Sequence, residues 1–182
     1  MTFNKKNKLL LTAGAVLLGT IIISSCSSTN APLETVPVVD LKRYMGKWYE
    51  IASIPQRFTK GCTCTTADYK LNADEGYVEV YNSCLKEGKV SDVKGKAFPV
   101  EGSSNSKLRV QFFWPFKGDY WILELDPDYR YVMVGAPDRE SLWFLSRTPT
   151  MDEATYARLK QLAKSKGFPV EQLQMTEQRC AE

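Results

Sequence analysis

The sequence contains no histidine. This absence excludes Ser-His-Asp and Cys-His catalytic relays, the usual histidine-containing zinc sites and histidine-ligated haem. Acidic residues are missing from residues 1–25, which hold Lys5, Lys6 and Lys8, so the remainder carries 21 basic and 21 acidic side chains. A neutral domain argues against a polyphosphate-binding surface, which needs a basic face. The 182 residues suffice for one ordinary domain, and with 43% hydrophobic and 12% aromatic residues they can bury a substantial core.

The first 26 residues predict a lipoprotein leader. The three lysines precede a fifteen-residue run, Leu9 to Ile23, that only Thr and Gly interrupt. This run is shorter than the about 20 residues of a membrane-spanning helix and is typical of a signal-peptide core. It ends in Ser24-Ser25-Cys26, which resembles the bacterial lipobox, whose cysteine is lipidated. An ordinary cleaved or membrane-embedded leader is the alternative.

This interpretation divides the chain into a signal peptide over 1–25, a lipidated Cys26 with a flexible tether over 26–39, and one domain over 40–182. The tether is polar and carries proline. Ser27 follows the cysteine where enterobacterial sorting would need Asp to hold a lipoprotein at the inner membrane. We therefore expect a lipid anchor in the outer membrane, with the domain on its periplasmic side.

Four further cysteines fit an exported chain: Cys62, Cys64, Cys84 and Cys180. An even number in an oxidising compartment suggests two disulfides, and three connectivities are possible. The single residue between Cys62 and Cys64 is too few for the usual zinc-ribbon pair, and the chain has no CxxC motif. We expect neither a metal site nor a cofactor.

Eight short β-rich runs each end in turn residues, and in several of them apolar and polar residues alternate. They span 48–54, 65–71, 77–82, 92–98, 108–114, 120–125, 130–134 and 141–146. A helix follows, with a capping box at Thr150 and Glu153 and an end at Gly167-Phe168-Pro169. The pattern predicts an all-β, eight-stranded antiparallel up-and-down barrel with one C-terminal helix packed on the outside. Closure of the sheet into a barrel removes its exposed edge strands and leaves room inside for one small ligand. A β-sandwich is the alternative fold.

Three motifs in order give the chain a resemblance to the lipocalin family. Gly46-Lys47-Trp48 opens the first strand, Asp126-Pro127-Asp128-Tyr129 occupies the turn between the sixth and seventh, and Arg147 ends the eighth. The match at 126–129 is loose because no Thr precedes the Asp. Longer stretches, such as 46–52 and 142–149, resemble the apolipoprotein-D-like branch and its bacterial outer-membrane lipoproteins. The resemblance covers about residues 40–180.

The resemblance assigns structural roles to Gly46, Trp48 and Arg147. It implies that Trp48 plugs the narrow end of the barrel, that Arg147 stacks on its ring, and that Gly46 permits a close chain approach there. The same branch joins the second strand to the C-terminal extension. It therefore implies a Cys64–Cys180 disulfide, which leaves Cys62–Cys84.

Side-chain parity and the resemblance together predict which residues line the cavity. If Trp48 points inward, Glu50 and Ala52 do so too, and Trp143 shares the parity of Arg147. Val110 and Phe112 belong to the buried face of the fifth strand. The resemblance adds further inward residues: Ala67, Tyr69, Tyr120, Ile122 and Val132. We expect these residues to bind a ligand; the alternative is that they fill a closed core.

The mouth of the barrel is predicted to lie among loops 54–61, 85–91, 114–119 and 136–140. Aromatic residues beside basic ones, as in Ile54-Pro55-Gln56-Arg57-Phe58 and Trp114-Pro115-Phe116-Lys117, suit a lipid headgroup or membrane contact. Packing of these loops on each other is the alternative.

We predict a lipid-anchored lipocalin, not an enzyme, that binds and stores or transports a small hydrophobic ligand in the cell envelope. The resemblance implies a fatty acid or lysophospholipid as the ligand. The expected partners are this ligand and the membrane that holds Cys26, with no nucleic acid; the sequence leaves open a homodimer. The alternatives are a lipocalin-type enzyme with a cavity thiol from Cys62, Cys64 or Cys84, or the carboxylate of Glu50, and a structural lipoprotein without ligand.

Overall fold

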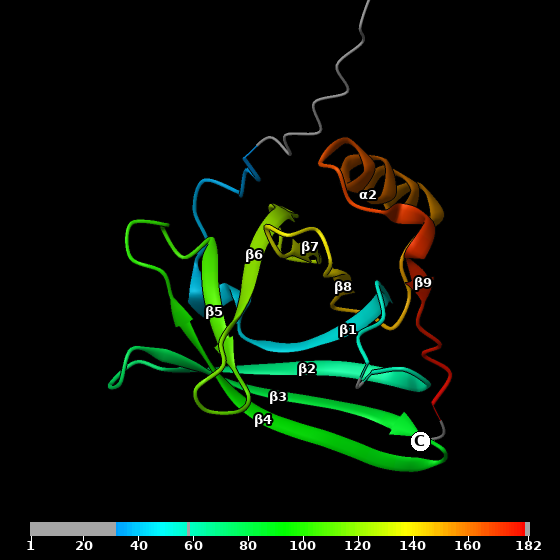
Figure 1. Cartoon of the computed structure of the whole chain (residues 1–182), viewed down its shortest axis with the longest axis horizontal. Coiled ribbons are helices and arrows are strands. Elements are labelled where there is room, and N and C mark those ends of the chain that lie inside the picture. Colours follow the sequence, from blue (N-terminus) through cyan, green and yellow to red (C-terminus); the bar gives the residue numbers. More distant parts are fainter. Residues whose placement is uncertain (1–31, 58, 181–182) are drawn as a thin grey trace, which may run out of the picture.

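The antiparallel strands form one sheet that curls until its edges pair, which closes it into a barrel (Figure 1). The computed structural model describes residues 32–57 and 59–180. The strands are β1 (Gly46–Ser53), β2 (Cys62–Asn72), β3 (Tyr77–Lys86), β4 (Lys89–Pro99), β5 (Lys107–Gln111), β6 (Gly118–Leu125), β7 (Tyr131–Gly135), β8 (Leu142–Ser146) and β9 (Gln174–Met175). They are accompanied by the helices α1 (Leu41–Tyr44) and α2 (Glu153–Ser165) and the 3₁₀ turn η1 (Val170–Gln172). Sequential neighbours pair from β2 to β8, and β1 closes the barrel by pairing with both β8 and β2.

The eight-stranded barrel confirms the predicted fold class, and the sandwich alternative is wrong. Each predicted run overlaps a strand, although β5 ends at Gln111, before the predicted end at Trp114. Two short elements were not predicted: α1, which precedes β1, and β9, which pairs with Ala52 and Ser53 of β1, beyond the residues of β1 that pair with β2. The strands β2, β3 and β4 are longer than predicted and form the wide, lower wall of the barrel in Figure 1.

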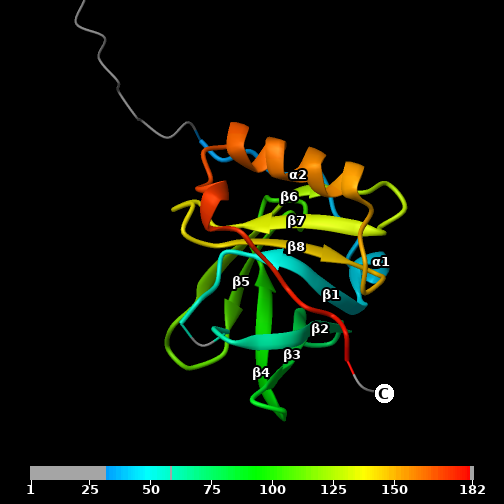
Figure 2. The ribbon, with the colours of Figure 1, turned by 90° about the vertical axis from the view of Figure 1, so that its right-hand side faces the viewer.

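Helix α2 lies along the outside of the barrel, across β7 and β8 (Figure 2). Its buried residues, Leu159 and Ala163, pack with Phe144 and other apolar side chains between the helix and the sheet. The predicted capping box of Thr150 and Glu153 is wrong, because Glu153 is the first residue of the helix and Thr150 lies outside it. Asp152 caps the helix, and its carboxylate accepts a hydrogen bond from the Thr155 amide at 2.8 Å. The end at Gly167 is confirmed, and that residue adopts a φ of 85°.

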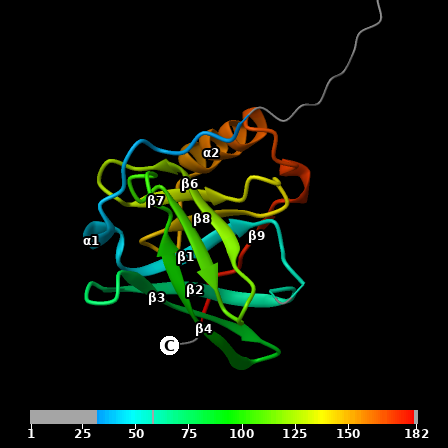
Figure 3. The same cartoon turned by 60° about the vertical axis from the view of Figure 1, so that its left-hand side comes forward.

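The segment before α1 packs on the barrel. Leu33 and Val39 are buried, and the Val36 and Val39 amides donate hydrogen bonds to the carbonyls of Ile122 and Ser104 at 2.9 and 3.0 Å. Figure 3 shows this segment running from α1 toward α2. The described part of the predicted flexible tether, residues 32–39, is therefore docked, because it carries apolar side chains that the barrel surface can bury. The predicted signal peptide and Cys26 lie outside the described residues.

No helix within residues 32–57 and 59–180 has the length and hydropathy needed to cross a bilayer.

Candidate functional site

The narrow end of the barrel is closed by Trp48, which is fully buried. The Arg147 guanidinium lies 3.8 Å from the centre of the Trp48 ring and donates hydrogen bonds to the carbonyls of Lys47, Arg43 and Tyr44 at 2.8, 2.9 and 3.1 Å. Burial lowers the pKa of Arg147, and nearby Tyr44 opposes that shift. This geometry is the stack that the sequence predicts.

Gly46 has a different role at this end from the one predicted. Its φ is 89°, a conformation that L side chains rarely adopt, whereas a Cβ would lie at an ordinary 3.6 Å from the nearest Arg147 nitrogen. Glycine is therefore required by the backbone conformation of the turn from α1 into β1. The predicted close chain approach is not the reason for it.

Three tyrosines form the floor of the barrel above Trp48. The Tyr120 hydroxyl hydrogen-bonds to the hydroxyls of Tyr44 at 2.7 Å and Tyr69 at 3.2 Å. Burial raises the pKa of all three well above the ordinary value, so the three phenols stay neutral. The floor is therefore polar but uncharged.

A cavity of about 680 Å³ opens above this floor. Its wall is mostly apolar and is built by inward residues of every strand except β7 and β9, among them Val78, Val80, Ala97 and Leu108. The volume lies within the range of small-ligand sites, roughly 300–1,000 Å³. The barrel thus encloses space for one small apolar molecule.

Most of the predicted ligand-binding residues come together on this wall. The lining includes Ala67, Tyr69, Val110, Phe112, Tyr120 and Trp143. Ile122 and Val132 also face the barrel interior, but both are fully buried in the core cluster that contains Trp48, outside the cavity lining. Whether any of these residues touches a ligand stays a prediction.

The inward prediction for Ala52 is wrong. Glu50 pairs with Leu145, but Ala52 pairs with Phe144, so a bulge inserts Ile51 into β1. The extra residue reverses the parity, and Ala52 packs with Phe144 and Leu159 under α2. Val78 and Val80 also line the wall and were not among the predicted ligand residues, although their alternation with Glu79 indicates that they point inward.

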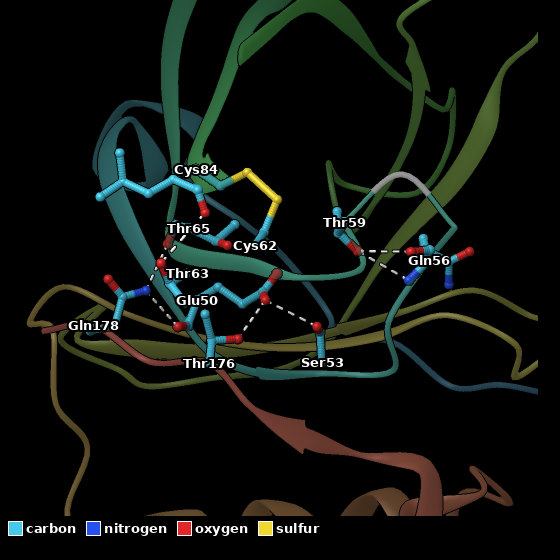
Figure 4. Close-up of a disulfide and its surroundings, with 11 residues drawn as sticks. Glu50, Ser53, Gln56, Thr59, Cys62, Thr63, Thr65, Cys84, Thr176 and Gln178 are labelled. Atoms are coloured by element: carbon cyan, nitrogen blue, oxygen red, sulfur yellow. Dashed lines mark hydrogen bonds between the residues drawn. A yellow bond between two sulfur atoms is a disulfide. The ribbon is translucent and has the colours of Figure 1, made fainter. Parts of the chain in front are cut away.

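The cavity wall has one polar stretch, centred on Glu50. Its side chain is 7% exposed, and its Oε1 accepts hydrogen bonds from the Thr176 hydroxyl at 2.6 Å and the Ser53 hydroxyl at 3.0 Å (Figure 4). Burial raises the pKa of Glu50, and these two hydrogen bonds lower it by less. Thr176 belongs to the C-terminal segment, which crosses the outside of β1 and β2 in Figure 2.

Both implied disulfides are present. Cys62 is bonded to Cys84, and Cys64 to Cys180, with Cα atoms 5.6 and 5.8 Å apart. Beside the second bridge, the Gln178 amide donates hydrogen bonds of 2.8 Å to the carbonyls of Glu50 and Thr65. None of these four cysteines offers a free thiol.

Three of the four predicted loops contribute to the mouth. Thr59, Ser91 and the segment 116–119 line the cavity entrance. Loop 136–140 instead borders a separate outer hollow, where the Arg139 side chain donates a hydrogen bond to the carbonyl of Lys166. Its predicted place at the cavity mouth is therefore wrong, because it packs against the chain that follows α2.

The loop between β5 and β6 exposes aromatic side chains beside the mouth. Phe113, Trp114 and Phe116 are 71, 86 and 78% exposed. The alternative in which the loops pack on each other does not hold for these three residues. In the other apolar loop, Ile54 is buried with the side chains under α2, and Phe58 lies outside the described residues.

Comparisons with known proteins agree with this architecture. A family model for a lipocalin-like domain matches residues 39–178. The chain is 41% identical to temperature-induced lipocalin-1 of Arabidopsis thaliana over 155 residues, covering 80% of this chain and 83% of that protein. It is 37% identical to outer membrane lipoprotein Blc of Escherichia coli K12 over 165 residues, covering 88 and 93%, and 36% identical to bovine apolipoprotein D over 152 residues, covering 79% of each. The solved structure of insecticyanin from the tobacco hornworm superposes with a TM-score of 0.65 at 21% identity, covering 81% of this chain and 85% of that one, which supports the fold alone.

Proposed function

The chain belongs to the lipocalin family, and from this premise we propose that its barrel binds and stores or transports one small hydrophobic ligand. The observation that carries the proposal is the cavity of about 680 Å³ between the tyrosine floor and the mouth. A closed core without ligand would leave no such space.

An acyl chain suits this cavity. Val78, Val80, Ala97 and Leu108 give the wall an apolar surface. Transfer of an acyl chain from water onto such a surface is favourable by about 0.8 kcal/mol for each buried methylene, before the cost of ordering. Fatty acids and lysophospholipids carry such chains. The exposed aromatic loop at 113–116 lies where it can contact a lipid surface while the mouth opens toward it.

The anchor and location form the second part of the proposal. A relative that is 37% identical is named an outer membrane lipoprotein, and the leader of this chain ends in Ser24-Ser25-Cys26. We propose that a lipid on Cys26 holds the domain at the outer membrane, on the periplasmic side. Cys26→Ala should remove acylation and release the protein from the membrane fraction, whereas unchanged lipid-dependent attachment would contradict the anchor.

Catalysis has less support than binding. The thiol variant of the enzymatic alternative needs a free cysteine, but Cys62, Cys64, Cys84 and Cys180 all lie in disulfides. The carboxyl of Glu50 remains, and in the described part of the chain it has no general acid or base partner within hydrogen-bond distance, only the hydroxyls of Ser53 and Thr176.

Tryptophan fluorescence tests the ligand proposal. Trp143 lines the cavity, so a lysophospholipid or long fatty acid should change the emission saturably, and Trp143→Phe should remove most of this change. Trp121→Phe is the matched control, because Trp121 packs in the cluster under α2. Trp143→Arg should abolish binding by burying an unpaired charge. Equal lipid binding by Trp143→Arg would place the ligand outside the barrel.

A further inference from the structure

The cavity wall carries a strip of polar side chains on three adjacent strands: Glu50 on β1, Thr65 on β2 and Asn82 on β3. All three line the cavity. The strands are in register there, since Trp48 pairs with Ala67 and Ala67 with Asn82. Figure 4 shows Glu50 and Thr65 close together beside the Cys62–Cys84 disulfide. The strip stands out from the mostly apolar lining because it holds buried polar atoms without partners.

The hydrogen bonds of the strip are incomplete. Ser53 and Thr176 both donate to Oε1 of Glu50, whereas Oε2 accepts no hydrogen bond from the described residues. Thr65 Oγ1 and Asn82 Oδ1 are buried and likewise have no partner within residues 32–57 and 59–180. Buried polar atoms are normally satisfied, and each one left without a partner costs free energy. The strip therefore holds buried oxygen atoms beside the cavity whose hydrogen bonds are not made by the described residues.

The charged side chains of the cavity wall are mostly acidic. Three acidic residues line the cavity, Glu50, Asp92 and Asp119, against one basic residue, Lys117. Asp119 is paired with Arg109 at 3.4 Å, and the Lys117 ammonium lies over the Phe98 ring at 4.2 Å. Glu50 has no ion-pair partner in the described part of the chain. A carboxylate ligand beside Glu50 would meet an acid that no ion pair with the described residues neutralises.

We propose that the strip of Glu50, Thr65 and Asn82 binds the head of an amphiphile that donates hydrogen bonds, an ammonium or a hydroxyl group, and discriminates against a carboxylate. The inference rests on the proposed function, because it presumes that an acyl or alkyl chain fills the apolar part of the cavity. The tyrosine floor does not serve this role, since its hydroxyls hydrogen-bond to each other. The geometry thus favours an alcohol or amine over a free fatty acid.

Three probes with the same chain test the headgroup: hexadecylamine, hexadecan-1-ol and hexadecanoate, each titrated at neutral pH against the whole domain. We expect the amine and the alcohol to bind about tenfold or more tightly than hexadecanoate. Glu50→Gln keeps the side-chain volume and an oxygen for Ser53 and Thr176, and it should erase the discrimination by weakening the amine and strengthening hexadecanoate. Glu101→Gln makes the same charge change in an exposed turn between β4 and β5 and should leave the ranking unchanged.

A second variant guards against misfolding of Glu50→Gln. Asn82→Leu removes one acceptor without touching the charge, and it should weaken the alcohol while hexadecanoate stays unaffected. If the wild-type protein binds all three probes equally, and neither variant alters the ranking, the headgroup inference is overturned while the proposed function stands. If none of the probes binds, both are overturned.

Discussion

Replacing Arg147 by alanine should destabilise the fold and leave ligand affinity unchanged. The side chain connects three parts of the closed end: it covers the Trp48 ring at 3.8 Å, donates to carbonyls of residues 43, 44 and 47, and donates to the Tyr129 carbonyl at 3.3 Å. It lies outside the described lining of the cavity. The role is therefore structural, and its loss should appear in stability.

The magnitude follows from these contacts. The stacked guanidinium contributes about 0.5–2 kcal/mol, and hydrogen bonds from a charged donor about 1.5–3 kcal/mol each before the freed carbonyls regain water. Allowing for that rehydration, Arg147→Ala should lower the free energy of unfolding by about 3–4 kcal/mol. This is a large share of the 5–15 kcal/mol typical of a domain.

Urea unfolding followed by fluorescence measures the effect, with Arg158→Ala as the control. Arg158 on α2 reaches toward the barrel, where its 47% exposed side chain pairs with Glu124 on β6 at 2.9 Å and faces the Tyr131 ring at 5.5 Å. Its loss should cost less than about 1 kcal/mol because the pair is solvent-exposed. Arg147→Lys keeps the charge but loses the planar guanidinium with its several donors, so its loss of stability should lie between those of Arg147→Ala and Arg158→Ala. Equal stability of the two alanine variants, or a loss of lipid affinity without a loss of stability in Arg147→Ala, would refute the structural role.

Three further predictions concern stability. Hydrogen bonds from Arg130 lower the pKa of Asp126 to about 2, so its contribution is present above the unfolded value of 3.8 and is lost as the pH falls toward 2. Asp126→Asn should thus be about 1–2 kcal/mol less stable than wild type at pH 6, and the difference should shrink below pH 3.8 and vanish only below about pH 2. A constant difference in thermal unfolding across this pH range would contradict the prediction. Gly46→Ala should lower the free energy of unfolding in urea by about 1–3 kcal/mol, because the φ of Gly46 is 89°. Gly118→Ala is the control and should change it little, since Gly118 lies in open space without a positive φ. Equal losses of stability would argue against backbone strain at Gly46. The Cys64–Cys180 bridge spans 116 residues. Replacing both cysteines by serine should lower the free energy of unfolding by up to about 4–5 kcal/mol, measured in guanidinium. An unchanged midpoint would show that the bridge does not constrain the unfolded chain.

Local sequence patterns were sufficient to predict the barrel. Turn residues bound each β-rich run, and eight runs joined by short links leave closure as the solution that removes their edges. The stack at the closed end was also accessible, because Gly46, Trp48 and Arg147 form recognisable motifs at strand ends. The cysteine positions alone left three connectivities open, and only the resemblance to the family implied the two disulfides that the structure contains.

The parity of side chains was reliable only where the strand is regular. It placed Glu50 and Trp143 on the cavity wall, but it failed at Ala52, two residues after Glu50, because Ile51 forms a bulge. A bulge depends on how β1 pairs with β8, so its position is not encoded in the alternation of β1 alone.

The sequence alone therefore determined the order of the eight barrel strands and helix α2, since these depend on neighbours along the chain, and its family motifs implied the stack at the closed end. Only the tertiary structure decided that residues 33–39 dock on the barrel, and that the cavity stays open with an acceptor strip in its wall. Glu50 is the clearest case: its partner Thr176 is 126 residues away, and its burial depends on every strand around it. Hydrogen bonds and desolvation at such distances in sequence arise from packing, which no local pattern records.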